Sequence, residues 1–287
     1  NGIKSKSICS CALKLVFPND INPYQAFARF FIHNKATYGV FLLGNEVNKD
    51  GSHPIIGDPL EKVCLAATDW QLNKSDLIKP LNPKAKSAIY SSLKIIHRHH
   101  FSSALKRMSV LCSYSNYDKV KSTVSTNYLV TVKGAAEILG PMLKEKPTDY
   151  DKQHKRLARK GIRVLTLAYK KIQKEDYLSD NSGNLRNEDE IREMKAISRD
   201  KIESNLIFVG FVCVNTPLKK DSVEALKQLR NSSHHLVMIT GDHALTATYV
   251  ALKTYILKSP KDPILVVDLD SEDKSNLKFN ILELNYI

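Results

Sequence analysis

The residues best suited to chemistry in this chain lie between positions 101 and 134. Phe101 offers a flat ring on which a base can stack, and Lys106 and Lys133 offer ammonium groups for phosphate oxygens. Gly134 follows Lys133 directly and permits a turn or a close backbone approach. A stacking ring with two cations predicts a nucleotide site.

A second set follows an apolar run near residue 240. In Thr240-Gly241-Asp242 the hydroxyl can donate to an oxyanion, the glycine permits a sharp turn, and the aspartate can cap the next helix. A purely structural turn is the alternative for these three residues. Arg163 lies in an apolar strand pattern, where a guanidinium needs solvent or an anion.

Two further features have more ordinary interpretations. Glu61 falls in the first turn of a helix that Asp58-Pro59 would start, where its charge suits the helix dipole. The histidines at 97, 99 and 100 have no carboxylate or cysteine nearby, so they predict a basic rim before Phe101 rather than a metal site.

The elements that must position these residues follow from periodicity and turn residues. Alternation over 108–112 and 128–132 predicts two strands around a polar hairpin loop, with Lys133-Gly134 ending the second strand before a helix over 135–139. Also expected are a helix from 59 to about 72, a loop over 73–88, a strand over 162–169 and one helix over 187–204.

The pattern changes near residue 205. Apolar strands over 206–214 and 235–240 alternate with helices over 221–230 and 244–253, which is typical of a parallel, doubly wound sheet. Thr240-Gly241-Asp242 then lies at the carboxyl end of a strand, where such sheets bind ligands. Two final strands, over 264–269 and 277–284, predict a hairpin.

Composition excludes several classes. The 43 basic and 30 acidic residues give a net charge of +13, but the lysines are scattered, which favours a generic basic surface over a dedicated nucleic-acid surface. The five cysteines form no CxxC pair, so neither a disulfide framework nor a zinc site is indicated. No apolar run approaches the roughly 18–20 residues that span a bilayer.

Taken in order, the segments GDPLE, FSSALKRMSV, VKGAAE, GIRVLTLAY and MITGDHALTA resemble those of the P-type ATPases. GDPLEK followed by DW, HFSSALKRMSV, and TPLKKDS ahead of MITGD resemble the endoplasmic-reticulum branch of the fifth subfamily. The resemblance implies an α+β nucleotide-binding domain over 1–204, a twisted antiparallel sheet flanked by helices. It further implies an incomplete α/β haloacid-dehalogenase-like phosphorylation domain over 205–287, ending in the hairpin.

The resemblance also implies roles and ligands. Phe101 would stack on adenine and Glu61 would meet its edge, while Lys106, Lys133 and Gly134 would line the pocket. Arg163 would reach the phosphates. Thr240, Gly241 and Asp242 would contribute to the phosphoryl-transfer site. ATP and Mg²⁺ are the expected cofactors, with the magnesium aspartates outside this chain.

The sequence departs from the family pattern at several positions, and these departures bear on whether the chain can hydrolyse ATP. KGAAE replaces KGAPE, His243 replaces an asparagine, and neither DKTGT, with its phosphorylated aspartate, nor GDGxND is present. We expect a monomeric, cytosolic fragment that binds ATP without turning it over. Its parent would be an integral protein of the endoplasmic-reticulum membrane, with actuator and transmembrane domains, that couples ATP hydrolysis through an aspartyl-phosphate to transport of transmembrane helices.

Three alternatives stay open at this point. The parent could transport polyamines or cations, or the chain could be a basic nucleic-acid-binding or scaffold module, which charge alone favours. A freestanding haloacid-dehalogenase-type phosphatase is disfavoured because its only DxD candidate at a strand end, Asp268-Leu269-Asp270, lies after the Thr-Gly-Asp strand, in the wrong order.

Overall fold

The computed structural model describes most of the chain from residue 92 onward and short stretches before it. The described ranges are 12–16, 41–42, 55–56, 62, 64, 70–73, 75–80, 92–118, 123–173, 187–257, 264–269 and 277–282. They divide into two compact units, the first built mainly from residues 13–150 and 165–212 and the second mainly from 151–164 and 213–287. Within these ranges no helix is both long and apolar enough to cross a membrane.

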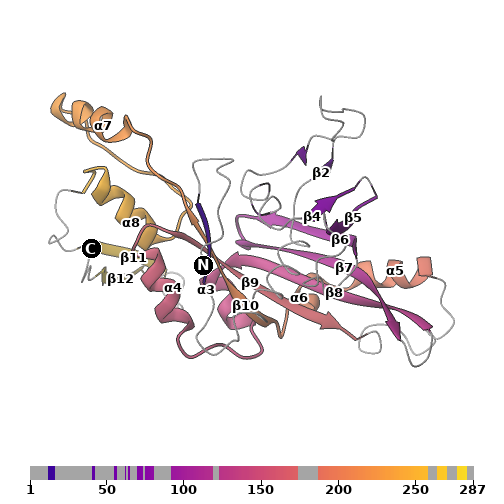
Figure 1. The fold of residues 1–287 in the computed structure, drawn as a ribbon. Coiled ribbons are helices and arrows are strands. Elements are labelled where there is room, and N and C mark those ends of the chain that lie inside the picture. Colours follow the sequence, from indigo (N-terminus) through magenta and orange to yellow (C-terminus); the bar gives the residue numbers. More distant parts are fainter. Residues whose placement is uncertain are drawn as a thin grey trace, which may run out of the picture. The chain divides into compact units, whose positions relative to one another are not determined.

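An eight-stranded sheet dominates the first unit (Figure 1), in the order β1-β10-β9-β8-β7-β6-β5-β4. Its strands are β1 (Ala12–Val16), β4 (Trp70–Leu72), β5 (Leu77–Pro80), β6 (Leu93–Ser102), β7 (Arg107–Asp118), β8 (Thr123–Ala135), β9 (Arg163–Ile172) and β10 (Ile207–Asn215). Each strand from β4 to β8 pairs antiparallel with the next, up to β9. The antiparallel sheet predicted for the first part of the chain is therefore confirmed. A separate antiparallel pair joins β2 (Phe41–Leu42) to β3 (Ile55–Ile56).

Short helices accompany the strands. They are α3 (Ala136–Leu139), the 3-10 turn η1 (Gly140–Met142), α4 (Tyr150–Ala158), α5 (Asn187–Ala196), α6 (Arg199–Ile202), α7 (Ser222–Asn231) and α8 (Ala244–Lys253). The single helix predicted over 187–204 is wrong, because the chain is extended at Ser198, with ψ of 143°, between α5 and α6. Met194 and Ile202 are nevertheless buried, so both helices keep an apolar side on the protein.

The β7–β8 hairpin is longer than alternation predicts. The polar segment expected as a loop is largely paired, with residues 113–118 opposite residues 123–128. Main-chain N–H and C=O groups pair whatever the side chains, and a strand with a face toward water tolerates Ser, Thr and Asn. The second strand also continues through Lys133-Gly134, its predicted end, to Ala135.

The start of the sheet differs from the predicted helix and loop. Residues 70–72, predicted as helical, form β4, and β5 falls within the predicted loop over 73–88. Asn73 makes the turn between them, since its Oδ1 accepts two backbone N–H bonds, at 3.1 and 2.9 Å. Ile78 on β5 is buried, so packing of this β4–β5 edge against the protein outweighs the helical pattern of the residues up to 72.

An aromatic cluster ties α3 and the start of α4 to the sheet. The Tyr150 ring packs against Phe208 and Phe211, with centroids 5.2 and 5.0 Å away. Its hydroxyl donates to the Ala136 carbonyl at 2.8 Å and shares a hydrogen bond of 2.6 Å with Thr166 Oγ1. This buried group anchors the helix that follows β8.

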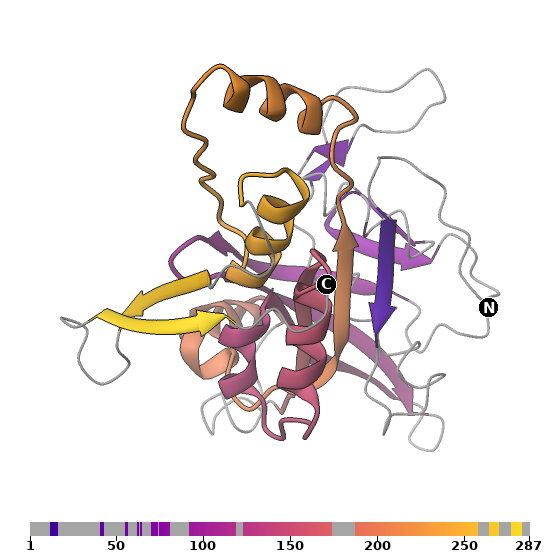
Figure 2. The same cartoon turned by 90° about the vertical axis from the view of Figure 1, so that its left-hand side faces the viewer.

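The second unit contains α7, α8 and the antiparallel hairpin of β11 (Ile264–Leu269) and β12 (Leu277–Leu282), drawn in yellow in Figure 2. The predicted helices and the hairpin are confirmed. The strand predicted over 235–240 is wrong: these residues carry no regular structure, and Val237 and Ile239 are 81% and 96% exposed. A strand needs a neighbour to pair with, and β10, its expected partner, lies between β1 and β9 instead.

Candidate nucleotide-binding site

The turn between β6 and β7 carries two of the predicted site residues. The Phe101 side chain is 61% exposed, so its ring is open for stacking. Lys106 closes the turn by donating its N–H to the Ser102 carbonyl at 2.7 Å, with φ of 48°. That left-handed conformation is uncommon for residues other than glycine, so neighbouring contacts must hold the turn.

Gly134 lets the next strand pass beneath this turn. A Cβ atom built on Gly134 would lie 2.6 Å from Leu139 Cδ1, 2.7 Å from Arg107 Cβ and 2.8 Å from the Lys106 carbonyl oxygen. The same close approach lets Ala135 N–H donate to the Lys106 carbonyl at 3.0 Å. The glycine of the Lys-Gly pair therefore serves the packing of the turn.

Lys133 precedes Gly134 on β8, and its side chain is buried. It is opposite Met108 and Leu167 in the strand register, so it lies on their face of the sheet. The register between β6 and β7 shifts between His99 and Ser102, so alternation along β6 does not assign Phe101 to a face. Phe101 on β6 and Lys133 on β8 lie on strands separated by β7 alone, and they supply an exposed ring and a recessed cation of the kinds that the predicted roles require.

The opposite face carries a buried ionic cluster. Glu203, fully buried, accepts hydrogen bonds from Arg107 Nε at 2.6 Å, Ser109 Oγ at 2.6 Å and Arg199 Nε at 2.9 Å. Burial alone would raise the pKa of Glu203, but the hydrogen bonds from Ser109, Arg107 and Arg199 outweigh it and lower the pKa. The carboxylate is therefore ionised and neutralised by two guanidinium groups.

Sequence patterns do not predict this cluster. Its one signal is that Arg107 and Ser109 alternate on one face of a strand, which places two polar side chains where a partner is needed. Nothing local indicates Glu203, which lies 96 residues from Arg107 along the chain.

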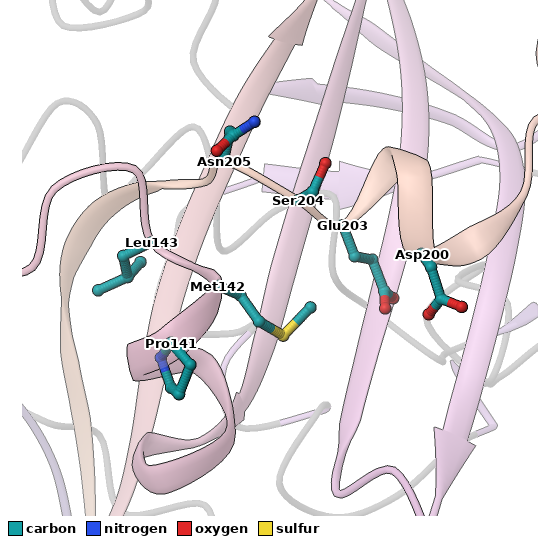
Figure 3. A pocket seen from close by; sticks show the side chains of 7 residues that line it. All are labelled: Pro141, Met142, Leu143, Asp200, Glu203, Ser204 and Asn205. Carbon is teal, nitrogen blue, oxygen red and sulfur yellow. The ribbon is translucent and has the colours of Figure 1, made fainter.

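A pocket of about 320 Å³ lies beside α6 (Figure 3), but its chemistry does not suit a nucleotide. Its lining residues are Pro141, Met142, Leu143, Asp200, Glu203, Ser204 and Asn205. Its charged members, Asp200 and Glu203, are both acidic and Glu203 is already neutralised by arginines, so the lining offers no cation for phosphates. None of the predicted nucleotide-contacting residues lines it.

The second unit brings Arg163 and Asp242 together. Asp242 Oδ1 accepts from Arg163 Nη2 at 2.6 Å and Nε at 2.8 Å, which supplies the anion that Arg163 was predicted to need. Asp242 N–H donates to Thr240 Oγ1 at 3.1 Å, so the Thr-Gly-Asp turn is held by its own hydroxyl. The predicted capping role of Asp242 is wrong: His243 caps α8, its Nδ1 accepting from Leu245 N–H.

Gly161 and Thr246 fix the segment that precedes Arg163. Gly161 has φ of 73°, and a Cβ atom there would collide with the Tyr249 ring on α8. Thr246, also on α8, donates from Oγ1 to the Ile162 carbonyl at 3.2 Å. Arg163 and the Thr-Gly-Asp turn are therefore held by one helix. Glu61 lies outside the described residues, and its role stays a prediction.

Several known proteins are similar to this chain in sequence. Residues 138–221 match the family model of the P-type ATPase cytoplasmic domain N. The endoplasmic reticulum transmembrane helix translocase of Schizosaccharomyces pombe is 36% identical over 81% of this chain and 17% of its own length. A probable manganese-transporting ATPase, PDR2, of Arabidopsis thaliana is 38% identical over 72% of this chain and 15% of its own. The probable cation-transporting ATPase 13A4 of Gallus gallus is 28% identical over 88% of this chain and 20% of its own.

These relatives agree with the motifs. The chain spans 15 to 20% of the length of these three relatives. Helix translocases of two other fungi, Aspergillus fumigatus and Saccharomyces cerevisiae, are also 36% identical, above the 28% of the 13A4 protein. The chain therefore belongs to the P-type ATPase family, in its endoplasmic-reticulum branch, and carries sequence of the family's cytoplasmic domain N.

Proposed function

We propose that this chain is the ATP-binding part of a P-type ATPase of the endoplasmic-reticulum membrane. The observation that carries the proposal is the exposed Phe101 ring on β6 and the recessed Lys133 on β8, strands separated by β7 alone, with Lys106 closing the turn between β6 and β7. Adenine would stack on Phe101, Glu61 would meet its edge, and the two lysines would attract phosphates. Gly134 keeps the turn close enough to β8 for this arrangement.

The proposal includes a domain division. Residues 1–204 would form the nucleotide-binding domain and residues 205–287 part of a haloacid-dehalogenase-like phosphorylation domain. The exposed Val237 and Ile239, and α7, none of whose residues is buried, support this. Such apolar side chains are expected of a segment whose sheet partners lie elsewhere in the polypeptide.

Thr240, Gly241 and Asp242 would contribute to phosphoryl transfer in the parent, and Arg163 would reach the phosphates. Mg²⁺ would neutralise phosphate charge when bound. The Thr240 hydroxyl and the Asp242 carboxylate offer oxygen ligands for Mg²⁺, although Asp242 is paired with Arg163 in this structure. A single carboxylate fits a magnesium ion that takes further ligands from ATP and from outside this chain. Since no DKTGT nucleophile is present, the chain would bind ATP without hydrolysing it.

We propose transmembrane helices as the substrate class of the parent. Three of the four relatives at 36–38% identity carry that activity in their names, and the fourth is named for manganese. Stimulation of the full-length ATPase by an apolar helical peptide, but not by Mn²⁺, would be the expected result. Stimulation by Mn²⁺ or a polyamine alone would instead support the cation-transport alternative.

Calorimetric titration of the 287-residue chain with ATP tests the binding site. Phe101→Ala should weaken binding at least about fivefold, because stacking contributes roughly 1–3 kcal/mol per base. Lys133→Met keeps the buried aliphatic volume and removes the charge, so it should also weaken binding. Tyr255→Ala is the matched control, because it removes another exposed ring, 49% exposed, from the second unit.

The outcomes distinguish an ATP-binding site from a nucleic-acid-binding module. Unchanged ATP affinity in both Phe101→Ala and Lys133→Met would refute the site. Binding to polynucleotides that falls steeply with salt and exceeds binding to ATP would favour the nucleic-acid module instead.

A further inference from the structure

A single guanidinium joins the two arms of the turn that carries Phe101 and Lys106. His100 precedes the turn on β6, and Arg107 begins β7 directly after it. Arg199, on α6, donates from Nη2 to the Arg107 carbonyl at 3.0 Å and from Nη1 to the His100 carbonyl at 3.5 Å. Each contact is to the backbone, so Arg199 restrains the path of the chain at both ends of the turn.

Glu203 fixes the direction of that guanidinium. It lies one helical turn after Arg199 and binds Arg199 Nε with Oε1, the same oxygen that accepts from Ser109 Oγ. Its other oxygen, Oε2, binds Arg107 Nε. Because the Glu203 side chain is fully buried, water cannot replace these partners, and turning Arg199 away would leave buried charge poorly compensated.

The turn needs support of this kind. Lys106 occupies the left-handed region, which is unfavourable for a side chain with a Cβ atom, and the Phe101 ring is mostly exposed, so packing restrains it little. Two backbone hydrogen bonds, from Lys106 N–H to Ser102 and from Ala135 N–H to Lys106, and the close packing of Gly134 also restrain the turn.

We propose that Arg199 and Glu203 are positioning residues for ATP, a clamp on α6 that holds the turn in the conformation that receives the nucleotide. Neither residue would touch the ligand, since Glu203 is fully buried and binds Arg107 and Ser109 on the sheet face opposite that of Lys133. The inference rests on the proposed nucleotide function. Its physical basis is that a turn ordered before binding loses less conformational freedom when the ligand arrives.

The test compares Arg199→Lys with wild type in the 287-residue chain. Lysine keeps the charge, but one ammonium group cannot bind Glu203 and both backbone carbonyls. Arg192→Lys is the matched control, because that arginine is 81% exposed and pairs with Asp189 on its own helix. The first readout is ATP affinity by calorimetry, and the second is amide hydrogen exchange at Lys106 and Ala135.

Arg199→Lys should weaken ATP binding about fivefold to tenfold, the factor that corresponds to one hydrogen bond of ordinary net strength. In a Phe101→Ala background the same change should cost less than about twofold, because coupled sites are not additive. Exchange at Lys106 and Ala135 should accelerate, while Arg192→Lys changes neither readout. Glu203→Gln keeps the side-chain shape and should reproduce both effects.

The possible failures are distinguishable. A wild-type chain that does not bind ATP refutes the proposed function. Wild-type binding that Phe101→Ala weakens but Arg199→Lys does not, or equal losses in both backgrounds, overturns the clamp alone. Unaltered exchange at Lys106 and Ala135 in both clamp variants overturns it as well, whatever the ATP titration shows.

Discussion

Replacing Gly134 by alanine tests how tightly the turn between β6 and β7 is packed against β8. The added Cβ would meet three groups at 2.6 to 2.8 Å, and two of them, Arg107 Cβ and the Lys106 carbonyl, cannot move without the backbone. Overpacking of this kind costs about 1–3 kcal/mol, offset by roughly 0.4–1 kcal/mol from the stiffer unfolded chain. We therefore expect Gly134→Ala to destabilise the first unit by about 1–2 kcal/mol.

Urea unfolding followed by tryptophan fluorescence is the suitable assay. Trp70, the single tryptophan of the sequence, lies in β4 of the same sheet, so its emission reports on the first unit. Gly140→Ala is the matched control, because its nearest neighbour, Tyr150 Cε1, is 3.4 Å from a built Cβ and the backbone is helical there. The midpoint should fall for Gly134→Ala with an unchanged slope, and should stay or rise for Gly140→Ala.

A second consequence concerns function. Relief of the clash would push the Lys106 turn away from β8, so Gly134→Ala should weaken ATP binding as well as stability, whereas Gly140→Ala should weaken neither. Equal midpoints for wild type and Gly134→Ala, or a larger loss in Gly140→Ala, would refute the packing argument.

Two further predictions concern charge. Asp242→Asn should cost less than about 1 kcal/mol of thermal stability, because the Arg163 side chain is 51% exposed and solvent screens the pair; a loss above about 2 kcal/mol would contradict this. Burial, and after it nearby positive charge, lowers the pKa of His97 and His99 in the folded state. The unfolded chain then binds more protons, so stability should fall as pH drops through the unfolded value of 6.5, and the double change to Gln should flatten urea midpoints between pH 7.5 and 5.5. An unchanged pH profile in that variant would refute the assignment.

Local signals account well for some elements. The helix over 244–253 was predictable to the residue because a glycine turn precedes an uninterrupted run of helix-compatible residues. The two central strands were predictable from alternation of apolar and polar residues, although residues 107–112 and 128–134 are buried on both faces. Phe101, Lys106 and Lys133 could be proposed as a nucleotide site from the sequence because the ring and the two cations lie close together along the chain.

Other features depend on partners far along the chain. Residues 235–240 have an apolar strand composition, yet they form no strand. Their expected partner, β10, pairs with β1 and β9 in the eight-stranded sheet instead. The helix expected to reach residue 72 gives way to β4 because Asn73 builds a turn and an adjacent strand is available. The ionic cluster around Glu203 required knowing which helix covers β7, and no local pattern carries that information.

The left-handed backbone at Lys106 has a consequence for reagent design. A substitution at this position can remove the charge while keeping the backbone conformation. Asparagine tolerates φ of 48° far better than most residues, whereas a β-branched residue does not. Lys106→Asn would therefore give a chain with the native turn and one cation fewer, while Lys106→Val would lose both together. Carried into the full-length protein, the asparagine form would separate defects caused by loss of one cation from defects caused by loss of the turn.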